Sequence, residues 1–236
     1  MSLVRTEGIV LKTFKYSDSS KIVTIFSKET GKFNALVKGA RNLKSKTSGI
    51  YNLINKIDVH FNKKETRDLQ VISKAEVLDS YNNLKSDFDS LSIGYRVIEI
   101  LNLSLTEYYI NQNLYNFTNV LLNQINNTQN SGKSFLLYFQ IGFLEKMGLN
   151  FLSVSNVKSL YETNLVSDAF NIKIEDFDQI REFYGNGMSF ESSNSKESLT
   201  EQQVDKFINA FDTIIKNNFL SNRNFRTKQI LKDIAN

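Results

Sequence analysis

The sequence contains no cysteine, no proline and only one histidine. Without cysteine the chain cannot form disulfides or thiolate metal sites. A single histidine cannot build an ordinary structural zinc site, and a nucleophilic triad around it has no obvious partners. We therefore expect no metal, no cofactor and no catalytic residue, and we predict that the protein is not an enzyme.

Long apolar segments are also missing. The longest, around Phe135–Leu144, is interrupted by Gln140 and is too short to span a bilayer. The N-terminus has no apolar core of signal-peptide length. The segment Ser131-Gly132-Lys133-Ser134 lacks the upstream glycine of a phosphate-binding loop. These absences predict a soluble cytoplasmic protein with no membrane partner.

The acidic residues that cluster do so where helices are expected to begin. Carboxylates at helix N-termini offset the helix dipole, and we prefer this role over a metal or acid–base site. His60 falls on the outward phase of a predicted strand, which favours a solvent-facing side chain. The clustered carboxylates are Asp87, Asp89, Glu175, Asp176 and Asp178.

Positive charge is concentrated in the first third of the chain. Residues 1–80 contain 15 Lys and Arg against 8 Asp and Glu, a net charge of +7, whereas residues 81–236 carry a net charge of −3. A basic region joined to a mildly acidic one suggests that the basic part meets a polyanion. A solvated lysine surface, enriched by AT-biased coding, is the alternative interpretation.

The first third also has the pattern of a β-structure. Five short segments rich in β-branched and aromatic residues lie between residues 9 and 77, and Glu29-Thr30-Gly31-Lys32 is a tight-turn signal. In the fourth segment, residues 54–61, the alternation predicts that Ile57, Val59 and Phe61 face inward. Five such strands suit a small barrel such as an OB-fold, although another small barrel or a sandwich has the same pattern.

From Asp87 onward the apolar period becomes helical. One predicted helix presents Leu91, Tyr95, Ile98 and Leu101 on one face. Thr200 and Gln203 form a capping-box signature before another amphipathic helix, and residues 222–235 are predicted to form the last. The expected fold is α+β, with an OB-fold domain over residues 1–80 and a helical domain over residues 81–236.

The segment after the third strand is the strongest candidate site. Residues 38–49 contain four cations and no acid, and flexible cations beside a barrel sheet can follow a phosphate backbone. Three aromatic residues nearby are candidates for base stacking, with the barrel core as the alternative role of each. The predicted DNA-binding residues are Lys38, Arg41, Lys44, Lys46, Phe14, Tyr16 and Phe33.

The order and spacing of these segments resemble the N-terminal barrel of the bacterial RecO family of DNA-repair proteins. A weaker match follows at a leucine-rich helix that ends in glycine. The resembling segments are Glu7–Leu11, Tyr16–Ser20, Ile22–Ser27, Thr30–Lys32, Lys38–Arg41, Lys44–Lys46 with Gly49, and Phe143–Leu149.

The resemblance implies an OB-fold followed by a helical domain that together bind single- and double-stranded DNA and anneal complementary strands. It also implies contacts with RecR and with the C-terminal tail of single-strand-binding protein, so that RecA can load in the RecF pathway. Many relatives carry four zinc-binding cysteines after the segment matching Gly148. This chain has none, and we expect apolar contacts of Leu152–Phe170 to replace the metal there.

The end of the chain is cationic, which suits the acidic tail of single-strand-binding protein. Arg223, Arg226 and Lys228 are the predicted protein-binding residues. Cations that complement helix C-termini are an equal alternative. For the whole protein, the alternative to a DNA-binding mediator is a protein-binding adaptor whose contact with DNA is incidental.

Overall fold

Five strands close into a barrel in the first third of the chain. The computed structural model describes residues 2–41, 49–64, 66–128, 132–149, 174–187, 199–220 and 223–227. The strand order is β1-β2-β3-β5-β4, and only β3 and β5 pair in parallel. The expected OB-fold is therefore confirmed. The strands are β1 (Ser2–Tyr16), β2 (Ser20–Ser27), β3 (Gly31–Val37), β4 (Lys56–Lys63) and β5 (Leu69–Asp79).

The barrel interior is filled by alternate residues of its strands. Ile57, Val59 and Phe61 of β4 are completely buried there, as the alternation predicts. Residues of β2 and β3 complete this core, including Val23 and Phe33. Burying one such side chain contributes roughly 1.5–3 kcal/mol, so the interior alone supplies a large driving force for closing the sheet.

The turn between β2 and β3 requires glycine. Gly31 has a φ of 75°, which side chains rarely tolerate, and a Cβ at this position would lie 2.3 Å from the carbonyl oxygen of Tyr109. The close approach allows the chain after α2 (Phe88–Ser104) to reach β3, where the Tyr108 N–H donates to the carbonyl of Lys32 (2.8 Å). The hairpin signal in the sequence thus also marks a contact between the barrel and the helical region.

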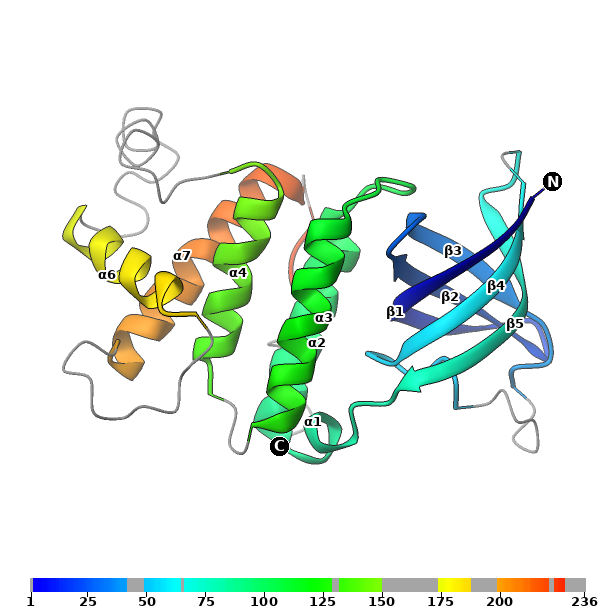
Figure 1. The fold of residues 1–236 in the computed structure, drawn as a ribbon, viewed down its shortest axis with the longest axis horizontal. Coiled ribbons are helices and arrows are strands. Elements are labelled where there is room, and N and C mark those ends of the chain that lie inside the picture. Colours follow the sequence, from blue (N-terminus) through cyan, green and yellow to red (C-terminus); the bar gives the residue numbers. More distant parts are fainter. Residues whose placement is uncertain are drawn as a thin grey trace.

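The helices follow the barrel and extend away from it (Figure 1). The strand-to-helix change lies between Asp79 and Asn82, close to the predicted boundary at Ser80. Whether residues 1–80 and 81–236 fold as independent domains stays a prediction. The helices are α1 (Asn82–Ser86), α2 (Phe88–Ser104), α3 (Gln112–Asn127), α4 (Ser134–Lys146), α6 (Ile174–Gly185) and α7 (Glu201–Phe219).

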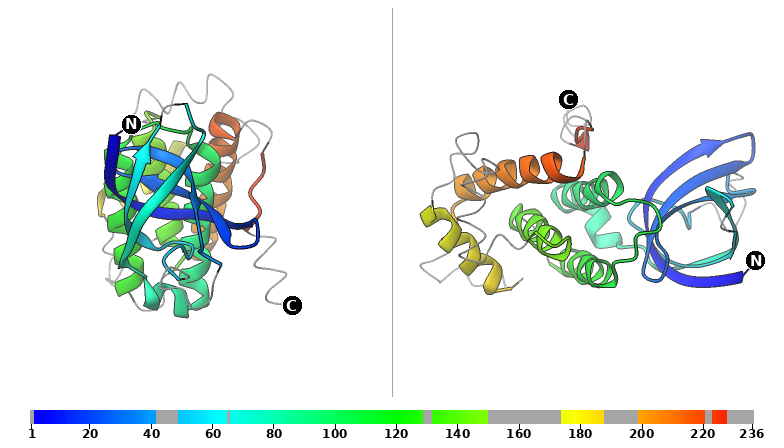
Figure 2. Two further views of the ribbon diagram at one scale, coloured as in Figure 1. Left: turned by 90° about the vertical axis from the view of Figure 1, so that its right-hand side faces the viewer. Right: turned by 90° about the horizontal axis from the view of Figure 1, so that it is seen from above.

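Helix α2 packs on one side against β1 and β2 and on the other against α3, α4 and α7. Figure 2 shows α2 and α3 next to the barrel, with α4, α7 and α6 farther out. Ile93, Val97 and Ile100 are therefore buried in addition to Ile98 and Leu101 of the predicted face. One apolar core runs from the outer surface of the barrel into the helices, so the two regions contact each other through packed side chains.

Side chains cap two helices as the sequence predicts. Asp87 accepts a hydrogen bond from the Ser90 N–H at the start of α2 (2.8 Å), and Thr200 and Gln203 form the capping box of α7. The predicted last helix lies mostly outside the described residues, and residues 223–226 are not helical. None of the described helices is both long enough and apolar enough to cross a membrane.

Candidate nucleic-acid interface

A β-bulge in β1 decides which of its side chains face outward near its end. The register with β2 shifts between Val10 and Lys12, which leaves Leu11 as an extra residue. Val10 packs inside the barrel, whereas Leu11 packs outward against the helices. Lys12 also faces outward and lines a groove together with Phe14. The bulge therefore turns Phe14 to the outer surface, since an extra residue re-aims the side chains that follow it.

Beyond the part that the helices cover, the outer surface of the sheet carries an apolar row. Phe14 pairs with Ile22, Ile22 with Leu36, and Leu36 with Val71. Phe14 is 43% exposed and Tyr16 is 49% exposed. Exposed aromatic rings on a sheet suit base stacking, which does not depend on sequence. We call the following outward residues the open face: Lys12, Phe14, Tyr16, Ile22 and Leu36.

Four cations lie on or beside the open face, and none of them pairs with an acidic side chain of the described residues. The Lys12 Nζ lies 5.5 Å from the centroid of the Phe14 ring. Lys38 is exposed directly after the inward Val37, and Lys15 is exposed at the end of β1, where it alternates with Phe14 to the other side of the strand. The Arg41 guanidinium donates to the Ser17 carbonyl, which ties the chain after β3 to the turn between β1 and β2. Unpaired cations next to exposed aromatic rings are what a single-stranded nucleic acid requires.

The opposite side of the barrel has a different character, because its cations are paired. The hydrogen bond from the Arg5 guanidinium holds the pKa of the Asp58 carboxyl below its usual value. His60 lies outward, as predicted, with its Nε2 3.6 Å from Asp58. The ion pairs on this side are Arg5 with Asp58 (2.7 Å), Lys56 with Glu7 (3.0 Å) and Lys74 with Glu76 (2.6 Å).

One predicted stacking residue is wrong. Phe33 is completely buried in the barrel, where its ring stacks on Phe61 with 4.7 Å between centroids. The alternation of β3 places Phe33 inside together with Ala35, so it belongs to the core and cannot contact a base. Lys44 and Lys46 lie outside the described residues.

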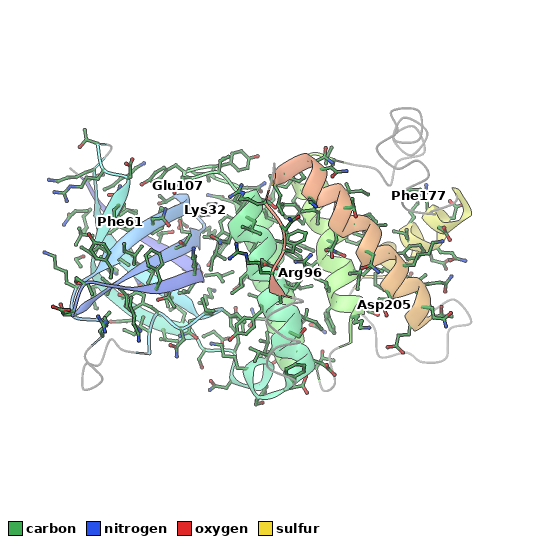
Figure 3. The ribbon with its side chains drawn as sticks, turned by 180° about the vertical axis from the view of Figure 1, so that it is seen from behind. Lys32, Phe61, Arg96, Glu107, Phe177 and Asp205 are labelled. Atoms are coloured by element: carbon green, nitrogen blue, oxygen red, sulfur yellow. The ribbon has the colours of Figure 1, made fainter. Side chains whose placement is uncertain are left out.

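A groove of about 570 Å³ opens where the barrel meets the helical region. Lys12, Phe14 and Asn34 line it on the barrel side, and Glu107 and Arg223 line it on the other. We call it the junction groove. Figure 3 shows Lys32 and Glu107 close together at this junction. No local sequence pattern indicates the groove, because its walls come from segments as far apart in the chain as Lys12 and Arg223.

Lys32 is a buried cation in the wall of the junction groove. Its ammonium group donates to the carbonyl oxygen of Asn102 (2.8 Å), and the residue is 8% exposed. Burial lowers the pKa of Lys32, and the positive charge of Arg223 lowers it further, whereas Glu107 acts in the opposite direction. Lys32 therefore lies close enough to Arg223 for the two positive charges to repel each other.

The predicted protein-binding residues near the C-terminus do not share one environment. Arg223 lines the junction groove and faces the barrel, whereas Arg226 is exposed outside it. Lys228 lies outside the described residues. The binding of an acidic peptide by these residues stays a prediction.

No group of three or more histidine, cysteine, aspartate or glutamate side chains within the described residues could hold a metal ion. Among the clustered carboxylates, Asp87 caps α2 and Asp89 lies in its first turn. Asp176 pairs with Lys206 of α7 (2.7 Å). These contacts fit the predicted structural role of the carboxylates.

Comparison with known proteins gives a consistent result for both regions. A family model described as "Recombination protein O N terminal" matches residues 1–81, and one described as "Recombination protein O C terminal" matches residues 85–157.

Several curated relatives carry the name "DNA repair protein RecO". The relative from Chloroherpeton thalassium is 34% identical over 168 residues, which cover 70% of this chain and 65% of that protein. The relative from Chlorobium limicola is 32% identical over 146 residues (62% and 56%), and the relative from Prosthecochloris aestuarii is 37% identical over 99 residues (42% and 38%). The matched part of the chain thus spans less than two thirds of the length of each of these relatives.

Proposed function

The chain belongs to the RecO family, and from this membership we propose that it acts in DNA repair by binding single-stranded DNA on the open face of its barrel. The observation that carries the proposal is the pair of exposed rings, Phe14 and Tyr16, beside the exposed cations Lys12 and Lys38, which have no acidic partner among the described residues. The rings would stack on bases while the cations contact phosphates. Neither contact reads sequence, so the binding would be general.

Family membership extends the proposal from binding to mediation. We propose that the protein also binds double-stranded DNA and anneals complementary strands in the cytoplasm, at the nucleoid. With RecR and the tail of single-strand-binding protein as partners, it would help RecA to load. In this role the protein holds strands together and catalyses no reaction.

The alternative function is a protein-binding adaptor. The uninterrupted core between the barrel and the helices supports it to some extent, because a rigid two-part surface suits a protein partner. The unpaired cations favour DNA, since an apolar protein interface has no need for them. The salt dependence of DNA binding separates the two functions, because counterion release is specific to a polyanion.

The test is the variant Lys12→Ala/Lys38→Ala, measured by fluorescence anisotropy with a single-stranded oligonucleotide at several salt concentrations. Each lost phosphate contact should lower the slope of log affinity against log salt by roughly 0.7, so the double variant should lose about 1.4. At 0.1 M salt this corresponds to an affinity roughly 25-fold weaker. A second variant, with Arg41, Lys44 and Lys46 changed to Ala, should lose about 2 in slope if all three residues contact phosphates.

The matched control is Lys133→Ala/Lys206→Ala, which removes the same charge from the helical region. Both lysines pair with acids there, Lys133 with Asp205 (2.9 Å) and Lys206 with Asp176 (2.7 Å). The control should keep the slope of the unchanged protein. If the salt slope falls equally in both double variants, the protein binds DNA through diffuse charge and not through the open face. If the unchanged protein does not bind the oligonucleotide, the adaptor function is favoured instead.

A further inference from the structure

The junction groove joins the open face to the C-terminal part of the chain. Phe14 and Lys12 belong to both the open face and the groove, so a strand that stacks on Phe14 has direct access to the groove. Across from them lies Arg223, which belongs to the helical region. A ligand on the barrel can therefore contact both parts of the molecule at once.

The chain that carries Arg223 is held in place by α2. The guanidinium carbon of Arg96 lies 3.4 Å from the centroid of the Phe225 ring, which is a close cation–π contact. The Thr227 hydroxyl and backbone N–H donate to the Glu99 carboxylate at 2.5 and 3.2 Å. Arg96 is itself fixed by ion pairs with Glu99 (2.7 Å) and Asp212 (2.6 Å). These contacts hold the segment that carries Arg223 against α2, and Figure 3 shows Arg96 near the middle of the molecule.

Most of the Arg223 guanidinium is available for a ligand. Its Nε donates weakly to the Leu220 carbonyl (3.4 Å), and its two terminal nitrogens have no hydrogen-bond partner among the described residues. A free guanidinium fork matches a phosphate group in geometry and charge. The nearby positive charge of Lys32 makes an anion at this point more favourable still.

The acidic residues of the groove indicate which kind of anionic ligand fits. Glu107 accepts a hydrogen bond from the Asn34 amide (2.5 Å), and Asp68 lines the same groove. Carboxylates repel an acidic peptide along its whole length. A nucleic acid can satisfy both kinds of charge. Its base amino groups can donate hydrogen bonds to the carboxylates, while its phosphates contact the cations.

We propose that the junction groove is a second part of the nucleic-acid interface, in which Arg223 contacts a phosphate of the same single strand whose base stacks on Phe14. The inference rests on the proposed function, since it extends the path of the strand from the open face. It assigns to Arg223 a role in DNA binding, whereas the sequence had suggested a role in peptide binding. The helical region then contributes directly to holding DNA.

The experiment compares Arg223→Ala with Arg226→Ala in the full chain. Both remove one cation from the same short segment, but Arg226 lies outside the groove. Binding of a single-stranded oligonucleotide is measured at several salt concentrations, and thermal melting checks that both variants fold. We expect Arg223→Ala to lower the salt slope by roughly 0.7 and the affinity about fivefold at 0.1 M salt, and Arg226→Ala to change neither.

Three results would overturn the inference. Equal losses in both variants would mean diffuse charge, and no loss in either would place the strand elsewhere. If Arg223→Ala weakens the binding of an acidic peptide with an apolar C-terminus but not the binding of the oligonucleotide, the groove is a peptide site. If Lys12→Ala/Lys38→Ala weakens binding while Arg223→Ala does not, only the inference fails. If the unchanged protein does not bind the oligonucleotide at all, the proposed function fails with it.

Discussion

Three cations inside the helical region differ from the cations of the open face in what they contact. In the helical region Arg96, Lys133 and Lys206 all pair with carboxylates at 2.6–2.9 Å. On or beside the open face Lys12 and Lys38 are exposed, without an acidic partner among the described residues. The first group satisfies charges within the protein, whereas the second is available for an external anion.

The contrast also holds within the barrel. The side formed by β1, β4 and β5 pairs its cations, as Arg5 does with Asp58, while the open face on β1, β2 and β3 does not. Net charge alone would not separate the two sides, because both are rich in lysine and arginine. Whether a cation forms an ion pair within the protein is therefore a better guide to the binding surface than the net charge of residues 1–80.

The largest expected effect comes from breaking a paired cation. Arg96 is 3% exposed and bridges Glu99 and Asp212, so Arg96→Ala removes the positive charge that these two carboxylates share. We expect the free energy of unfolding to fall by about 3–5 kcal/mol, measured by urea denaturation. The exposed pair of Lys133 is the control, and Lys133→Ala should cost less than about 1 kcal/mol. Similar losses in the two variants would contradict the structural role of the buried network.

Two phenylalanines of the barrel offer the next test, because one is buried and the other exposed. Phe33→Ala should lower the free energy of unfolding by about 3–5 kcal/mol, since it leaves a cavity against Phe61. Phe14→Ala should change that free energy by no more than about 0.5 kcal/mol. It should instead weaken single-strand binding by about 1–3 kcal/mol through lost stacking. Melting curves and anisotropy titrations of both variants give the comparison, and a stable Phe33→Ala would show that the core tolerates the loss.

Local patterns were sufficient to predict most of the fold. The inward residues of β4, the turn at Gly31 and the cap at Thr200 each depend on neighbours within a few residues, and all are confirmed. Short-range periodicity and capping chemistry explain this success. The stacking candidates Phe14 and Tyr16 are exposed, and their contact with bases stays a prediction.

The remaining features depend on contacts that no local pattern contains. The extra residue Leu11 breaks the period of β1, and the alternation alone gives no sign of it. Helix α2 is buried on two sides because it lies between the barrel and the other helices, whereas its sequence suggested one apolar face. Arg223 lines the groove opposite the barrel, two residues before Phe225, whose ring packs on Arg96 far away in the sequence.

A smaller effect on stability is expected at the start of α7, where the exposed Thr200 forms hydrogen bonds within the protein. The Thr200 hydroxyl accepts a hydrogen bond from the Gln203 N–H, and the Gln203 side chain accepts one from the Thr200 N–H (2.9 Å). Thr200→Ala should lower the free energy of unfolding by about 1 kcal/mol, measured by urea denaturation, and leave DNA binding unchanged. Thr200→Ser is the control and should keep the stability of the unchanged protein, because serine can form the same cap. A change in DNA binding would instead connect this end of the molecule to the interface.

The smallest effect concerns Asp87, the cap of the helix that joins the two regions, and it appears only at acidic pH. The hydrogen bond from the Ser90 backbone N–H holds the pKa of Asp87 below its usual value. In the pH range between the two values the unfolded chain binds more protons than the folded protein, so protonation favours unfolding. The contribution of the ionised cap is therefore complete above the unfolded pKa of about 3.9 and is lost as the pH falls through the lower folded value.

In Asp87→Asn the amide oxygen can still accept a hydrogen bond from Ser90 but does not titrate, so stability measured by urea denaturation should decline less steeply below about pH 4. Asp89→Asn removes a charge from the same turn without removing the cap, and it should keep the steeper decline that Asp87 causes. If both variants flatten the profile equally, the charge of the first turn, and not the capping hydrogen bond, sets the acid sensitivity of α2.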